Sequence, residues 1–170
     1  DINDIKAKDI PKDSQAMEYL ENRGFSYHSV KHFDVKVNKD GNIVFPYFDE
    51  NNQLTFIKYR PSHKVDNNSD VPKSWREKGT KPIFWNKDKI DTSEPLKIVE
   101  GETDVLALYQ AGLDNITTVP SGSSDLSFLK HDYDWVDQFD KIIIWPDQDD
   151  AGLKLLDELS TRLGRWRCSV

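Results

Sequence analysis

The feature that most constrains the fold is a regular alternation, beginning near residue 95, between short apolar runs and stretches of helical periodicity. The apolar runs are "LKIVE", "NITTVPSG", "KIIIWPD" and the beginning of "RWRCSV". Strands that are apolar on both faces are typical of parallel sheets, which are covered on both sides. Strands that alternate with helices provide the crossover connections that such sheets need. The pattern over residues 91–170 therefore predicts an α/β fold with a parallel sheet flanked by helices.

The first half of the chain follows a different pattern. Residues 1–13 are polar and charged, which predicts a linker or tail. Ser14 and Ser26 each precede a short stretch of helical periodicity, where a serine can cap the first turn. Farther along, the apolar period changes to two, and turn signals divide the segment into three strands. We therefore expect a smaller α+β subdomain with antiparallel hairpins over residues 14–90, including a long polar connection at 61–82.

Charge is distributed unevenly along the sequence. The net charge is −7, yet residues 55–90 hold nine Lys or Arg and four acids, a local charge of +5. Residues 91–150 hold three lysines and fourteen acids, a local charge of −11. Tyr59, Trp75, Phe84 and Trp85 are interleaved with the basic residues of this segment. This combination suits single-stranded DNA, because amines pair with phosphates and bases stack on rings. The alternative is a charged loop whose aromatic residues anchor it in the core.

Acidic side chains follow two of the apolar runs, at the strand ends where ligands gather in an open parallel sheet. Glu100 ends one run, Asp147 ends another, and Asp149 shares the side of Asp147 if the chain stays extended. Asp104 lies about one helical turn beyond Glu100. If the two strands are neighbours, the four carboxylates face one another and suit Mg²⁺ or Mn²⁺ rather than Zn²⁺. The alternative is a solvated helix start at residues 147–152.

Composition excludes several classes of protein. No segment approaches the roughly 18 apolar residues of a membrane span, so no membrane partner is expected. The first residues are charged, unlike a secretory signal peptide. Cys168 is the only cysteine, which excludes an intrachain disulfide and a Cys-based zinc site and fits a reducing compartment.

Two acidic motifs carry a resemblance to a known family. The segments "VEGETDVLAL" and "IIIWPDQDDAG" resemble the motifs of the Toprim domain, a Glu-Gly at one strand end and an Asp-x-Asp at another. Topoisomerases and bacterial and phage primases share this domain. The segment "KYRPSHK" and the hairpins before it resemble the basic subdomain of phage and mitochondrial primase-helicases. The resemblance covers roughly residues 14–170 and points to the RNA-polymerase (primase) domain of such proteins.

The resemblance implies a metal site and a set of contacts to nucleic acid. The implied metal ligands, for Mg²⁺ or Mn²⁺, are Glu100, Asp104, Asp147 and Asp149. The implied catalytic residues are Glu100, Asp147, Asp149 and Lys58. The residues expected to contact nucleotide or DNA are Lys58, Arg60, Lys64, Lys73, Arg76, Ser121 and Gly122.

The same resemblance implies the reaction and the partners. Ribonucleoside triphosphates would be joined into short RNA primers on a single-stranded DNA template by metal-dependent nucleotidyl transfer. A replicative helicase domain, in cis or in trans, would be a further partner. The implied location is the cytoplasm of a bacterium or of a phage-infected host, with an organelle as the alternative.

The sequence departs from the family pattern in three respects. One cysteine excludes the zinc ribbon that selects the template in phage primases. No GxxxxGK[ST] motif occurs, so the helicase motor is absent. The chain stops inside or just after the fourth expected strand, before a loop that carries another family aspartate. These departures predict a fragment of a larger primase-helicase. The alternatives are a non-catalytic Toprim module that binds DNA, and a metal-dependent Toprim nuclease or topoisomerase.

Overall fold

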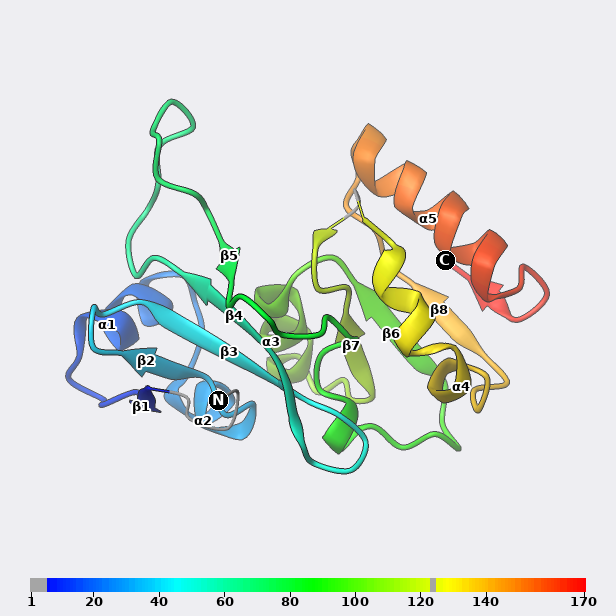
Figure 1. The fold of residues 1–170 in the computed structure, drawn as a ribbon, viewed down its shortest axis with the longest axis horizontal. Helices are drawn as coiled ribbons and strands as arrows, with labels where there is room; N and C mark the ends of the chain where they lie inside the picture. The colour runs from blue at the N-terminus through cyan, green and yellow to red at the C-terminus, as the bar shows by residue number, and fades with distance from the viewer. Residues whose placement is uncertain (1–5, 123–124) are drawn as a thin grey trace.

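The second half of the chain forms a parallel sheet (Figure 1). The computed structural model describes residues 6–122 and 125–170. The sheet has the order β7-β6-β8-β9, and its strands are β6 (Leu96–Val99), β7 (Ile116–Thr118), β8 (Ile142–Ile144) and β9 (Cys168–Ser169). The helices of this half are α3 (Glu102–Gln110), the 3₁₀ helix η3 (Ser127–His131), α4 (Tyr133–Val136) and α5 (Asp150–Leu163). The expected parallel α/β fold is confirmed.

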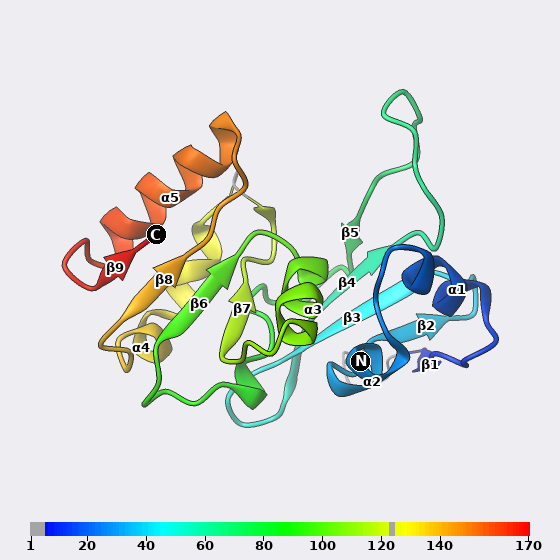
Figure 2. The ribbon, with the colours of Figure 1, turned by 180° about the vertical axis from the view of Figure 1, so that it is seen from behind.

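Both faces of the parallel sheet are covered, which explains why its strands are apolar throughout. On one face, Ile98 and Ile144 belong to a buried cluster that includes apolar side chains of η3, α4 and α5. On the other face, Val99 and Ile116 pack with residues of α3, which lies between the two sheets (Figure 2). Helices α3 and α5 are the next elements after β6 and β8, so the two helix starts lie at one edge of the sheet. No helix in the described part of the chain is long and apolar enough to cross a membrane.

The first half forms a five-stranded antiparallel sheet with the order β1-β2-β3-β4-β5. Its strands are β1 (Ala7–Asp9), β2 (Lys36–Asn38), β3 (Ile43–Phe48), β4 (Leu54–Arg60) and β5 (Trp75–Arg76). Helices α1 (Gln15–Asn22) and α2 (Tyr27–His32) are capped by Ser14 and Ser26, whose hydroxyls accept hydrogen bonds from Met17 N and Ser29 N at 3.2 Å. The expected α+β region with antiparallel hairpins is confirmed.

The structure differs from the sequence-based expectation in two polar segments. Residues 7–9 lie in the expected tail but pair with β2, and Ile10 directly after them is buried. Residues 75–76 lie in the expected long connection but pair with β4. Short edge strands are held by backbone hydrogen bonds rather than by an apolar face, so their composition does not reveal them. Residues 1–5 of the expected tail lie outside the described residues.

A shared core joins the two sheets. Phe45 of β3 and Val99 of β6 belong to one buried cluster. Trp85 lies between the sheets, where its Nε1 donates to the Pro46 carbonyl at 3.0 Å and its own carbonyl accepts from Thr117 Oγ1 at 2.5 Å. These buried contacts fix the position of the basic half relative to the acidic half. A subdomain boundary near residue 90 stays a prediction, because apolar packing continues across it.

Candidate active site

Two acidic residues meet where neighbouring strands end. Strands β6 and β8 are adjacent and parallel, with Leu96 opposite Ile142 and Ile98 opposite Ile144. Glu100 follows β6 and Asp147 follows β8, so both leave the sheet at the same edge. The Asp147 backbone N–H donates to Glu100 Oε1 at 2.8 Å. The sheet topology therefore brings together the two acids that lie 47 positions apart in the sequence.

The acids near this edge raise one another's pKa. Burial raises the pKa of Glu100, and the negative charges of Asp147, Asp149 and Asp104 raise it further, while the hydrogen bond from the Asp147 N–H acts in the opposite direction. Burial also raises the pKa of Asp104, with contributions from the charges of Asp147 and Glu102. Carboxylates that disfavour each other's ionisation gain most from a nearby cation. The donor set, all oxygen, is the kind that Mg²⁺ and Mn²⁺ prefer.

The side chains are not yet arranged as metal ligands. Among residues 6–122 and 125–170, no group of three or more His, Cys, Asp or Glu side chains is close enough to hold a metal ion. Asp149 caps α5, because its Oδ1 accepts a hydrogen bond from Gly152 N at 2.8 Å. Glu100 Oε1 is likewise engaged by a backbone N–H. The chemistry of the acids fits a hard cation, while the ligand set of Glu100, Asp104, Asp147 and Asp149 stays a prediction.

A glycine allows α5 to begin against the acidic edge. A Cβ atom on Gly152 would lie 2.1 Å from the Asp147 carbonyl oxygen and 2.7 Å from Glu100 Oε1. Any other residue would push the helix away from the Asp147 backbone and the Glu100 carboxylate. The glycine in "DQDDAG" belongs to a motif that carries the family resemblance. The close contacts also give a steric explanation for a glycine at this position.

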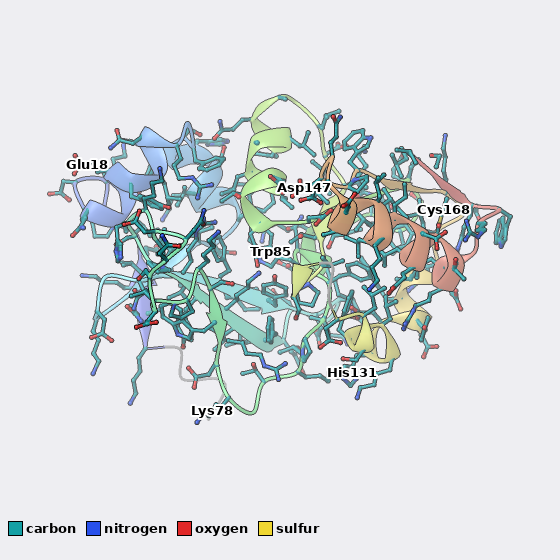
Figure 3. The ribbon with its side chains drawn as sticks, turned by 90° about the horizontal axis from the view of Figure 1, so that it is seen from above. Glu18, Lys78, Trp85, His131, Asp147 and Cys168 are labelled. Atoms are coloured by element: carbon teal, nitrogen blue, oxygen red, sulfur yellow. The ribbon has the colours of Figure 1, made fainter. Side chains whose placement is uncertain are left out.

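A cavity of about 690 Å³ connects the acids to the basic half of the chain. Glu100, Asp104 and Asp147 line one side of it. Figure 3 places Asp147 above Trp85 and near the start of α5. Of the residues expected to contact nucleotide or DNA, six line the same cavity: Lys58, Arg60, Lys73, Arg76, Ser121 and Gly122. The structure thus gathers nine of the predicted site residues around one space.

Lys58 is held in place by a residue that the sequence patterns did not single out. The Lys58 ammonium lies 2.9 Å from Glu102 Oε1 and 3.3 Å from Oε2. The Tyr47 hydroxyl donates to the same Glu102 Oε1 at 2.5 Å. Burial and the Glu102 charge raise the pKa of Tyr47 well above its ordinary value, so it stays a donor. Glu102 therefore positions the ammonium of Lys58 at the wall of the cavity.

Other expected contacts lie elsewhere. Lys64 lines a neighbouring cavity of about 400 Å³, which Arg60 and Lys73 also line. Phe84 and Trp85 are buried core residues and are not available for stacking with bases. Tyr59 and Trp75 stack on each other, with ring centroids 5.7 Å apart, and both line the larger cavity. Of the four aromatic residues expected to stack with bases, two therefore lie at the site and two lie in the core.

Lys87 is also withdrawn from the basic surface. It belongs to the 3₁₀ helix η1 (Lys87–Lys89), and its ammonium is buried between Asp132 and Glu50. Arg23, by contrast, was missed by the sequence patterns although it lines both cavities. Arg23 lies directly after α1 and next to Gly24. This position did not predict a role at the site, because an arginine at a helix end is usually solvated. The positive charge of Arg23 opposes the rise in the pKa of Asp104.

Comparison with known sequences identifies the acidic half. Residues 97–170 match a family described as Toprim-like. The chain is 32% identical over 141 residues to the Primase homolog protein of Arabidopsis thaliana, covering 74% of this chain and 39% of that protein. It is 27% identical over 176 residues to the Twinkle homolog protein, chloroplastic/mitochondrial, of the same plant, covering 93% of this chain and 24% of that protein. The chain thus spans less than half the length of either relative.

Solved structures share the fold. The primase fragment of the bacteriophage T7 primase-helicase protein matches with a TM-score of 0.71 and 24% identity, covering 89% of this chain and 62% of that one. A DnaG primase catalytic domain bound to ssDNA matches with a TM-score of 0.64 and 18% identity, covering 84% and 57%. The Aquifex aeolicus primase, with zinc binding and RNA polymerase domains, matches at 0.71 and 18%, covering 89% and 47%.

The parallel sheet with acids at the ends of β6 and β8 is thus the part of the chain that matches the Toprim-like family. The chain as a whole, with its antiparallel sheet placed beside that domain, has the fold of the primase catalytic core. The resemblance to Toprim primases that the two acidic motifs indicated is confirmed.

Proposed function

We propose that this chain is a DNA primase core that synthesises short RNA primers on single-stranded DNA, as part of a primase-helicase. One observation carries the proposal. A single cavity is lined by the acids Glu100, Asp104 and Asp147 on one side and by basic residues of β4 and β5 on the other. Nucleotidyl transfer between polyanions needs both kinds of group, because the substrates must be held by cations while the reacting phosphate is stabilised.

In the proposed reaction, the 3′-hydroxyl of the primer attacks the α-phosphate of a ribonucleoside triphosphate, and pyrophosphate leaves. A Mg²⁺ or Mn²⁺ ion bound at the acids would orient the triphosphate and offset the negative charge that develops. Its proposed ligands are Glu100, Asp104, Asp147 and Asp149. Glu102 holds the ammonium of Lys58 in place by an ion pair. From the wall of the cavity, this ammonium neutralises phosphate charge.

Further residues hold the template and the triphosphate. Arg60, Lys73 and Arg76 line the basic wall, where their side chains can contact phosphates. Lys64 extends this surface into the neighbouring cavity. Ser121 and Gly122 lie in the loop after β7 at the edge of the main cavity, and Gly122 adopts a φ of 63°, which glycine allows without strain. Residues 123–124 of that loop lie outside the described residues.

The partners follow from the same proposal. They are single-stranded DNA, ribonucleoside triphosphates and a replicative helicase domain in cis or in trans. Support comes from the solved T7 protein, which is named a primase-helicase, and from the DnaG domain, which is bound to ssDNA. We place the protein in a bacterial or phage-infected cytoplasm, and the chloroplastic/mitochondrial Twinkle homolog supports an organelle as the alternative.

One observation favours a second candidate, a DNA-binding module without catalysis. Glu100 and Asp149 each use one carboxylate oxygen for a backbone N–H, and the described acids are not grouped as metal ligands. Catalysis requires these two side chains to turn toward the cation, whereas a binding module does not. A metal-dependent nuclease would use the same acids on the phosphodiester of the DNA.

A single assay separates the three functions. The chain is incubated with end-labelled single-stranded DNA, radiolabelled ribonucleoside triphosphates and Mg²⁺ or Mn²⁺. We expect labelled oligoribonucleotides that require both DNA and metal, because the cavity supplies contacts for both. The same reaction with EDTA is the control. Shortened DNA without new RNA would instead support the nuclease, and bound but unchanged DNA would support the binding module.

A further inference from the structure

A further basic cavity lies outside both the proposed catalytic cavity and the neighbouring cavity that Lys64 lines. It has a volume of about 440 Å³, and its cationic residues come from β5, the segment that follows β5, and η3. Figure 3 shows Lys78 and His131 along the same side of the molecule, with Asp147 toward the other side. The basic side chains that line the cavity are Arg76, Lys81, Lys130 and His131. Two of them, Lys130 and His131, belong to the otherwise acidic Toprim-like domain.

The protein offsets only part of the positive charge in this cavity. Hydrogen bonds from Ser127 lower the pKa of Asp125 in the lining, and the charges of Arg76 and Lys130 lower it further. In the described part of the chain, Arg76, Lys81 and Lys130 form no ion pair. The one acid in the lining is Asp125, whose Oδ1 accepts a hydrogen bond from the Ser127 backbone N–H at 2.9 Å. Burial lowers the pKa of His131, and the charges of Lys81 and Lys130 lower it further. Unpaired cations that disfavour one another gain free energy when an anion enters.

The cavity shares one lining residue with the catalytic one. Arg76 lines both cavities, and it follows Trp75, which stacks on Tyr59 in the catalytic cavity. Tyr59 is fixed in this stack by its hydroxyl, which donates to Glu77 Oε2 at 2.6 Å. A DNA strand that passes the two rings meets Arg76 and then Lys81. Rings followed by basic side chains suit single-stranded DNA, because its bases are accessible.

We infer that the cavity lined by Lys81 and Lys130 binds the phosphodiester backbone of the single-stranded DNA template. The part of the template that it binds extends beyond the catalytic cavity. The inference rests on the proposed function and adds a contact surface to it. Lys81 and Lys130 supply the main charges, one from each half of the chain. A base-paired duplex is less suited to this path, because its bases are not free to reach the stacked rings.

The test compares DNA affinity across salt concentrations for the whole chain and the variant K81A/K130A. A labelled oligothymidylate of about 20 nucleotides exceeds the roughly 4–16 nucleotides that one single-strand binding domain covers. The logarithm of the binding constant falls as the logarithm of the salt concentration rises. Each lost phosphate contact makes this fall less steep by about 0.7, so the double variant should make it less steep by about 1.4. An oligothymidylate short enough for the catalytic cavity alone should bind the variant and the wild type equally. K141A/K154A, which removes two exposed lysines outside both cavities, is the matched control.

The outcomes distinguish the inference from the proposed function. Both substituted lysines are exposed, so the unfolding midpoint should not change, and K81Q/K130Q repeats the test with longer side chains. If both variants keep the wild-type slope on the long strand while the wild type binds DNA and makes primers, this inference is wrong and the proposed function stands. If the wild type binds neither strand at any salt concentration, both are wrong.

Discussion

Replacing Asp147 with asparagine is expected to slow primer synthesis by about 10²-fold or more, because one lost metal carboxylate removes several kcal/mol of transition-state stabilisation. Asparagine keeps the shape of the side chain and removes one of the charges that raise the pKa of Glu100 and Asp104. The folded state should therefore persist and become slightly more stable. Initial rates of labelled primer formation, together with the unfolding midpoint, measure the two effects separately.

Asp140→Asn provides the matched control, because Asp140 is an exposed acid immediately before the same apolar run. It should leave the rate of primer synthesis unchanged. An Asp147→Asn protein that folds normally and makes primers at the wild-type rate would show that the acidic edge of the sheet is not the reaction centre.

Replacing Asp132 with alanine is expected to lower the free energy of unfolding by about 3–5 kcal/mol, because it leaves a buried ammonium with only the half-exposed carboxylate of Glu50 as a partner. Lys87 Nζ lies 2.6 Å from Asp132 Oδ1, and the two side chains are 2% and 0% exposed. Asp132 Oδ2 also accepts the Phe84 backbone N–H at 2.6 Å. The ammonium lies 5.0 Å from the centroid of the Trp135 ring. This network connects η1 to the segment before α4 and so fixes how the two halves meet.

Denaturant unfolding monitored by tryptophan fluorescence measures this effect. Asp132→Asn should cost less than Asp132→Ala, because asparagine still accepts the Phe84 N–H. Glu50→Gln is the matched control, since Glu50 contacts the same ammonium at 2.8 Å but its side chain is 49% exposed, and exposed pairs contribute about 0–1 kcal/mol. A loss below about 1 kcal/mol for Asp132→Ala would contradict the assigned role of the buried pair.

Periodicity was enough to predict the main architecture. The apolar run "KIIIWPD" produced β8, and the serines at positions 14 and 26 produced helix caps, because burial on both faces and capping are local effects. The meeting of Glu100 and Asp147 also followed from local signals, once their strands were assumed to be neighbours. These features depend on few long-range contacts, and for that reason the sequence reveals them.

Features that depend on distant partners could not be predicted in this way. Lys87 resembles its basic neighbours in the sequence, yet the carboxylate that buries it comes from position 132. Trp85 resembles a stacking residue, yet it bonds to Pro46 across the core. Asp149 stays a proposed metal ligand, yet one of its carboxylate oxygens also caps α5, a role set by where the helix begins. In each case the deciding contact lies in another element of the fold or in the exact start of a helix.

The central claim is that the acidic edge of the Toprim-like domain binds a divalent metal ion. Titration with Mn²⁺, followed by the loss of its free electron paramagnetic resonance signal, tests this most directly. We expect the wild-type chain to bind about one or two ions at millimolar Mn²⁺, as one- and two-metal sites do, and Glu100→Gln and Asp147→Asn to weaken that binding strongly. Asp140→Asn should bind like the wild type. A folded wild-type chain that binds no Mn²⁺, or variants that bind it unchanged, would contradict the claim.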